Sequence, residues 1–180
     1  ILLRFRLHNV AFVADIEKAF LAIKIREEDR PFLRFFFLED FEKPKGKLAV
    51  YNFTVNLFGS RASTFILAAV LNHHLMIHES AVKSDIMDNV LVDNVVTGTN
   101  TTERTQRYYK ESGAVLNSAA MNLRQWTSNS PQVNSLAEQE KVHGPPAVHV
   151  LGINCNNAKD QLELAPTYPH NPNTERRGRF

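Results

Sequence analysis

The chain has 180 residues, enough for one domain with a substantial core, and 43% hydrophobic and 22% charged residues are ordinary for a globular protein. The net charge of +2 excludes a strong overall positive field, so nucleic-acid binding would require local clusters. A single cysteine, Cys155, excludes an internal disulfide and a multi-cysteine zinc knuckle, and no apolar run reaches the ~18 residues of a membrane span. We therefore expect an intracellular protein that is neither secreted nor inserted in a membrane.

The first half of the chain predicts a strand, a hairpin and a helix. Residues 9–14 form a continuous apolar run that is typical of a buried strand, and residues 16–25 are compatible with a short helix. Residues 33–38 and 48–55 are expected to form a hairpin with a long loop. Residues 62–78 form the clearest helix, with the following residues at helical spacing: Phe65, Ala68, Ala69, Leu71, Leu75 and Met76.

The second half adds an acidic strand pair, two helices and a second hairpin. Residues 90–96 are rich in β-branched residues but are interrupted by Asp93 and Asn94. Helices are expected at 101–121, with Tyr108, Val115 and Leu116 facing inward, and at 132–140. Strands are expected at 147–153 and 161–164, separated by a turn at 156–159. This order predicts an α+β fold, with a small antiparallel sheet covered by helices on one face.

Two aspartates stand at the ends of expected buried strands. Asp15 follows Ala11-Phe12-Val13-Ala14, and Asp93 follows Val90-Leu91-Val92. A carboxylate at such a place is costly unless a cation or a hydrogen-bond donor satisfies it. A divalent cation would relieve the repulsion between two of them, and hard oxygen ligands suit Mg²⁺. From spacing alone, two strand-end aspartates that cap turns are the favoured interpretation, and a metal site is the alternative.

Several blocks of this chain resemble, in order, the palm of reverse transcriptases from Pao/BEL-type LTR retrotransposons. They cover nearly the whole chain, and they are Ala14-Asp15-Ile16-Glu17-Lys18-Ala19-Phe20, Asp29-Arg30 with Leu33-Arg34-Phe35, Phe58-Gly59-Ser60-Arg61-Ala62-Ser63, Leu91-Val92-Asp93-Asn94-Val95, the segment from Asn122 to Asn129, and Val150-Leu151-Gly152.

The resemblance implies an RNA-directed DNA polymerase that performs nucleotidyl transfer with two Mg²⁺ (or Mn²⁺) ions. Asp15 and Asp93 would bind the metal, and Asn94 would complete the catalytic set. The resemblance further implies that Phe20 lies beneath the sugar and favours deoxynucleotides, while Arg34 and Gly59 contact phosphate or template. The partners would be an RNA or DNA template-primer, deoxynucleoside triphosphates, and the protease, RNase H and integrase of a polyprotein in a cytoplasmic particle or the nucleus.

The sequence also departs from the family pattern. Asn94 stands where a second aspartate is usual and brings no negative charge, and Leu91 stands where a tyrosine is usual. An alternative is therefore a catalytically decayed remnant that keeps the palm fold and binds nucleic acid or protein. A third reading is a zinc module built on His73, His74 and His78, although histidines on a helix surface explain that spacing more simply.

The ends of the chain predict a fragment. Residues 1–165 are expected to form a partial reverse transcriptase domain, the palm with part of the fingers. Residues 166–180, which contain Arg176, Arg177 and Arg179, are expected to form a flexible tail. The resemblance then implies that the isolated chain has no measurable polymerase activity.

Overall fold

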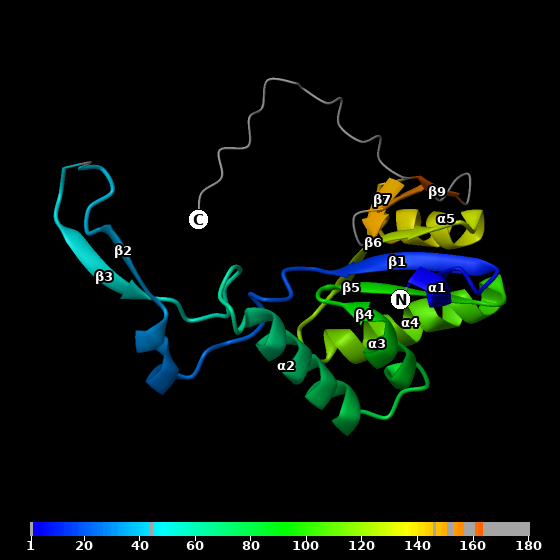
Figure 1. The fold of residues 1–180 in the computed structure, drawn as a ribbon, viewed down its shortest axis with the longest axis horizontal. Coiled ribbons are helices and arrows are strands. Elements are labelled where there is room, and N and C mark those ends of the chain that lie inside the picture. The colour runs from blue at the N-terminus through cyan, green and yellow to red at the C-terminus, as the bar shows by residue number, and fades with distance from the viewer. Residues whose placement is uncertain (1, 44, 146, 151–152, 157–160, 164–180) are drawn as a thin grey trace, which may run out of the picture.

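A four-stranded antiparallel sheet forms the centre of the protein in the computed structural model, which describes residues 2–43, 45–145, 147–150, 153–156 and 161–163. The strand order is β4 (Val90–Leu91), β5 (Asn94–Thr99), β1 (Val10–Ile16) and β6 (Leu123–Ser128) (Figure 1). The strand expected at residues 9–14 is confirmed as β1. Its neighbours β5 and β6 are distant in sequence, so the long-range pairing of β1 holds the domain together.

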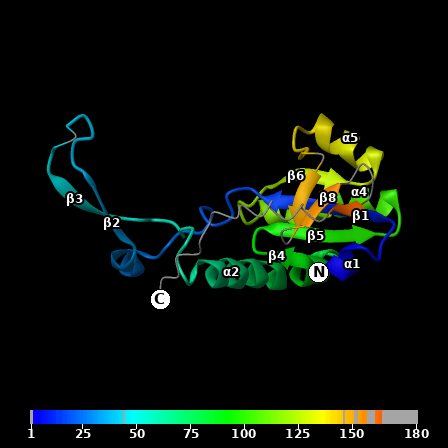
Figure 2. The same ribbon diagram turned by 45° about the horizontal axis from the view of Figure 1, so that its top comes forward.

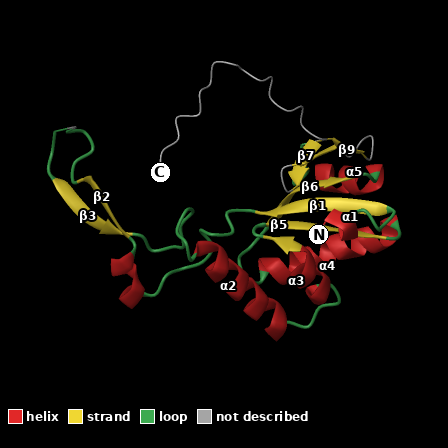
Figure 3. Ribbon diagram, in the orientation of Figure 1, coloured by secondary structure: helices red, strands yellow, loops and turns green. Residues whose placement is uncertain are grey.

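Helices cover one face of this sheet. Side chains of β1 alternate, and Phe12, Ala14 and Ile16 belong to the main core. That core also contains Leu67, Leu71 and Leu75 of α2 (Ser63–Ile77), together with residues of α3 (Lys83–Asn89), α4 (Thr102–Asn117) and α5 (Pro131–Gln139). Helices α2, α4 and α5 confirm the expected helices, and the inward positions of Tyr108, Val115 and Leu116 are confirmed as well. Figure 3 shows these helices around the sheet.

A smaller core lies on the opposite face. Ala11 and Val13 pack there with Val96 of β5, Phe5 of α1 (Leu2–Phe5) and Cys155. Cys155 belongs to a three-stranded antiparallel sheet of β7 (Ala147–Val150), β8 (Ile153–Asn156) and β9 (Gln161–Glu163). Strand β9 was expected, but the single strand expected at residues 147–153 is wrong, because β7 ends at Val150 and Ile153 begins β8, which pairs back on β7. The turn expected from residue 156 is wrong at its first residue, because Asn156 pairs within β8; residues 157–159 lie outside the described residues.

A two-stranded arm projects from this body (Figures 1 and 2). It consists of β2 (Arg34–Leu38) and β3 (Leu48–Asn52), which confirms the expected hairpin, and η1 (Glu27–Phe32), a 3₁₀ helix, precedes it. Phe35 packs against the rings of Tyr51 and Phe53, at centroid distances of 5.8 and 4.3 Å. A two-stranded hairpin gains little stability alone, so this ring cluster supplies most of the arm's internal packing.

Two expectations about local structure are wrong. Residues 17–22 form consecutive turns and not a helix, because Lys18 adopts a left-handed backbone conformation (φ 51°) that a right-handed helix excludes. In α2, the buried stripe is Leu67, Leu71 and Leu75, whereas Phe65 and Met76 are 74% and 66% exposed. The helix is apolar around most of its circumference, so spacing alone did not identify the buried side.

Several elements were not anticipated from the sequence, among them α3 and β6. Helix α3 is short and polar. Among its described residues, Ile86 is the one apolar side chain that is less than 1% exposed. Strand β6 contains an irregularity at Gln125 (φ 52°), and its register against β1 shifts between Val13 and Asp15. The extra residue places both Leu123 and Trp126 on the helix-covered side, which breaks the simple alternation of a strand.

Within the described residues, no helix is long and apolar enough to cross a membrane.

Candidate metal centre

One predicted aspartate lies near the end of β1, and the other lies in the turn that leads into the adjacent strand β5. Asp15 occupies the penultimate position of β1, and its Cα partner in β5 is Asn94. Asp93 lies in the two-residue turn that joins β4 to β5, because Leu91 pairs directly with Asn94. The backbone N–H of Ile16 donates to the carbonyl oxygen of Asp93 at 2.7 Å, which fastens this turn to β1. The fold therefore brings together two residues that are far apart in the sequence.

The turn is held in a costly backbone conformation. Val92 has φ 58°, in the left-handed region that a β-branched side chain adopts only with strain. Lys18 and Gln125 also have positive φ, and the register places both near Asp15, one on the following turn and one in the neighbouring strand. Residues in such conformations often accompany functional sites, where the surrounding structure enforces them.

The electrostatics show an uncompensated pair of acids. The pKa of Asp15 is raised above its ordinary value of 3.8, first by partial burial and then by the negative charges of Asp93 and Glu17. Asn94 donates from Nδ2 to Oδ1 of Asp93 at 3.0 Å, which satisfies one lone pair of that carboxylate. A cation between the two acids would remove the repulsion that burial intensifies.

The nearest cation in the sheet does not serve Asp15. Arg124 of β6 is the Cα partner of Asp15, but its Nε donates to Oε2 of Glu17 at 2.6 Å. This pairing lowers the pKa of Glu17, chiefly through the hydrogen bond. Sequence analysis missed the Glu17–Arg124 pair, although both residues stand inside the blocks that carry the family resemblance. Their engagement leaves the Asp15 carboxylate available for an external cation.

The predicted substrate-binding residues do not all gather near the aspartates. Phe20 is buried in the main core, 5% exposed, and its ring lies 4.7 Å from the exposed ring of Phe58. Gly59 lies in the exposed turn before α2, and its φ of 81° requires glycine or a strained side chain. Arg34 begins β2 on the projecting arm and is exposed. The central sheet thus brings together Asp15, Asp93 and Asn94, while Arg34 belongs to another part of the fold.

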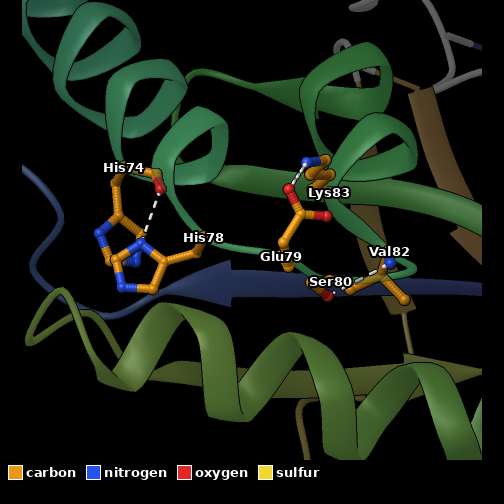
Figure 4. A network of polar contacts seen from close by, with 6 residues as sticks. All are labelled: His74, His78, Glu79, Ser80, Val82 and Lys83. Carbon is orange, nitrogen blue, oxygen red and sulfur yellow. Dashed lines mark hydrogen bonds and ion pairs between the residues drawn. The ribbon is translucent and has the colours of Figure 1, made fainter.

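The histidines of α2 have structural partners. Nε2 of His74 contacts the Val115 carbonyl oxygen at 2.7 Å and Ser118 Oγ at 3.1 Å, at the end of α4. His78 turns back toward its own helix, and its Nδ1 lies 2.9 Å from the His74 carbonyl oxygen (Figure 4). Across the part of the chain that the structure describes, no three His, Cys, Asp or Glu side chains form a group that could hold a metal. The candidate centre is therefore an aspartate pair with an amide neighbour.

Comparison of the chain with protein-family models gives no match, and comparison with curated proteins gives none either.

Proposed function

We propose that this chain is the palm segment of an RNA-directed DNA polymerase of the Pao/BEL retrotransposon type, within a longer polyprotein. The observation that carries the proposal is the β4–β5 turn, which presents Asp93 beside Asp15 on the neighbouring strand. The small antiparallel sheet with helices on one face is compatible with a palm. The ordered blocks of family resemblance supply the assignment to reverse transcription.

The donor set suits a divalent cation. Asp15 and Asp93 offer hard carboxylate oxygens, and Asn94 adds an amide that can offer its oxygen if it rotates. The pKa of Asp15 is raised first by burial and then by the charges of Asp93 and Glu17, and a cation would neutralise this second contribution. Bound Mg²⁺ would supply charge neutralisation for phosphoryl transfer and activation of a primer hydroxyl. The role of the protein is to hold two carboxylates in a fixed relation, which the Ile16–Asp93 backbone bond accomplishes.

The proposed nucleotide contacts require one rearrangement. If Phe20 is to lie beneath a deoxyribose, the ring of Phe58 that covers it must move aside. Phe58 is 65% exposed and precedes Gly59, whose added Cβ would meet no heavy atom within 4 Å, so this turn has room to move. Arg34, on the arm, would contact template or phosphate at a distance from the aspartates.

A second candidate is a non-catalytic remnant that keeps the fold and binds nucleic acid or protein. The observation that favours it is Asn94. This residue contributes no charge, and its amide N–H occupies an Asp93 oxygen at 3.0 Å that would otherwise face a metal. The two candidates differ in one measurable property, the affinity of the aspartate pair for a divalent cation.

Titration with Mn²⁺, followed by electron paramagnetic resonance, tests the proposal on the full 180-residue chain. The palm assignment predicts a site that Asp15→Asn and Asp93→Asn each weaken by at least about tenfold, because each removes a charged ligand. Asp88→Asn, an exposed acid on α3, is the matched control and should leave the site intact. Equal Mn²⁺ affinity in all four proteins would reject the metal centre and favour the remnant.

A filter-binding assay with an RNA–DNA template-primer then addresses the substrate. Binding that Arg34→Gln weakens, and that depends on salt, would support contact between the arm and the phosphate backbone. Arg26→Gln is the control, because Arg26 is exposed and already pairs with Glu28 at 3.5 Å.

A further inference from the structure

The outer side of α2 is apolar and uncovered. None of its 15 residues, Ser63–Ile77, is Asp, Glu, Lys or Arg. Leu67, Leu71 and Leu75 face the core, while Phe65 and Met76 are 74% and 66% exposed on the other side. Figures 1 and 2 show α2 along one side of the body, with η1 and the arm beyond its N-terminal end. An amphipathic surface helix normally presents charged residues to water, so this face needs a separate explanation.

Four residues on this side of α2, three of them exposed and Asn72 half-buried, have a spacing that reads the same in both directions. Phe65, Ala69, Asn72 and Met76 are separated by four, three and four residues, which is the spacing of core positions in a coiled coil. When two copies of such a stripe pack antiparallel, Phe65 faces Met76 of the partner subunit and Ala69 faces Asn72 of the partner subunit. The first pair joins a thioether to an aromatic ring, and the second fits a small residue against a larger one.

We propose that α2 is a self-association surface, on which a second copy of this chain packs antiparallel about a two-fold axis. The neutral stripe disfavours a charged partner, which would lose hydration of its charges without gaining an opposite charge in return, and a second copy brings an equally neutral stripe. A two-fold interface requires a self-complementary patch, and the palindromic spacing provides one. A 15-residue helix is only ~22 Å long, so the contact falls short of the ~800 Å² per partner of a stable complex, and the dimer is weak.

Analytical ultracentrifugation of the full chain over a range of concentrations tests the association. Wild type should show a monomer–dimer equilibrium, and Ala69→Arg should weaken it by at least about tenfold, because two like charges meet near the axis. Ile77→Arg is the matched control: Ile77 is also an exposed apolar residue of α2, 64% exposed, but lies off the stripe. A wild type that stays monomeric throughout, or an Ile77→Arg variant as weak as Ala69→Arg, would overturn the proposal. Circular dichroism confirms that each variant is folded.

Disulfide trapping tests the antiparallel register. Phe65→Cys and Met76→Cys proteins, mixed and oxidised, should form a heterodimer linked from residue 65 to residue 76. Each variant alone should form far less, because identical positions lie at opposite ends of the paired helices. Native Cys155 is 2% exposed and serves as an internal background, measured in oxidised wild type. Equal cross-linking of each variant alone and of the mixture would reject the register. Neither outcome depends on the aspartate pair, so this proposal stands apart from the polymerase assignment.

Discussion

Replacing Val92 with glycine should stabilise the protein relative to replacing it with alanine. Both substitutions remove the same branched side chain, which is 45% exposed, so they lose similar contacts. Alanine retains the Cβ that clashes at φ 58°, whereas glycine does not. The left-handed conformation costs an L-residue about 1–2 kcal/mol, and the extra chain entropy of glycine offsets roughly 0.5–1 kcal/mol of that gain. Val92→Gly should therefore exceed Val92→Ala in stability by about 1 kcal/mol.

Thermal unfolding followed by circular dichroism can measure this difference. For a domain of this size, 1 kcal/mol corresponds to roughly 2–4 °C in Tm. At an ordinary backbone position the order reverses, since glycine is then less stable than alanine by about 0.5–1 kcal/mol. A Tm for Val92→Gly below that of Val92→Ala would therefore refute the claim that the β4–β5 turn stores strain. If that strain helps to orient Asp93, Val92→Gly should also bind Mn²⁺ more weakly than Val92→Ala while unfolding at a higher temperature than that variant.

Two further predictions concern the sheet. Folding raises the pKa of Asp15 above 3.8, so ionisation of this carboxyl lowers the free energy of unfolding. The loss is absent below pH 3.8, grows as the pH rises toward the folded-state pKa, and is complete above it. Metal-free Asp15→Asn should therefore resist urea better than wild type at pH 7 and lose that advantage toward pH 4; an unchanged advantage would contradict this. Trp126→Ala should lose about 3–5 kcal/mol, because the Trp126 ring is 1% exposed and lies 4.6 Å from Tyr109 and 5.3 Å from Phe12; a loss below about 1 kcal/mol would contradict the core packing.

Elements with a clear local signal were predictable from the sequence. The apolar run before Asp15 gave β1, and the uncharged stretch of 15 residues gave α2. The side of α2 that is buried was not predictable, because Phe65 and Leu67 are equally apolar and only tertiary packing distinguishes them. The turns at residues 17–22 depend on the left-handed conformation of Lys18, a residue type with no preference for it.

The candidate site was predictable in composition but not in arrangement. The positions of Asp15 and Asp93 at strand ends indicated a pair of carboxylates, and the structure places Asp15 in β1 and Asp93 in the turn that leads into the adjacent strand β5. Strand β1 ends at Ile16 and β5 begins only at Asn94, so no local pattern could establish that the two strands pair. The same limit explains why Glu17 and Arg124 were not recognised as partners, since their contact depends on the shifted register of β6.

The end of β1 combines two kinds of unfavourable free energy. Val92, Gln125 and Lys18 each adopt a left-handed conformation that costs roughly 1–2 kcal/mol, so together they consume a considerable part of the 5–15 kcal/mol typical of a domain. The same region holds Asp15 against Asp93 without a neutralising cation, because Arg124 pairs with Glu17. Packing explains Gln125, whose bulge buries both Leu123 and Trp126. Val92 is 45% exposed, so burial gives no comparable explanation for its conformation, and within the described residues no hydrogen bond relieves the charge on the Asp15 carboxylate. A divalent cation would offset the electrostatic cost directly, by neutralising the two carboxylates. It would also give the strained turn a function, because Val92 holds Asp93 where the cation needs a ligand. The cost concentrated at these two residues therefore supports the proposed cation site over a remnant without one, and the Mn²⁺ titration distinguishes the two.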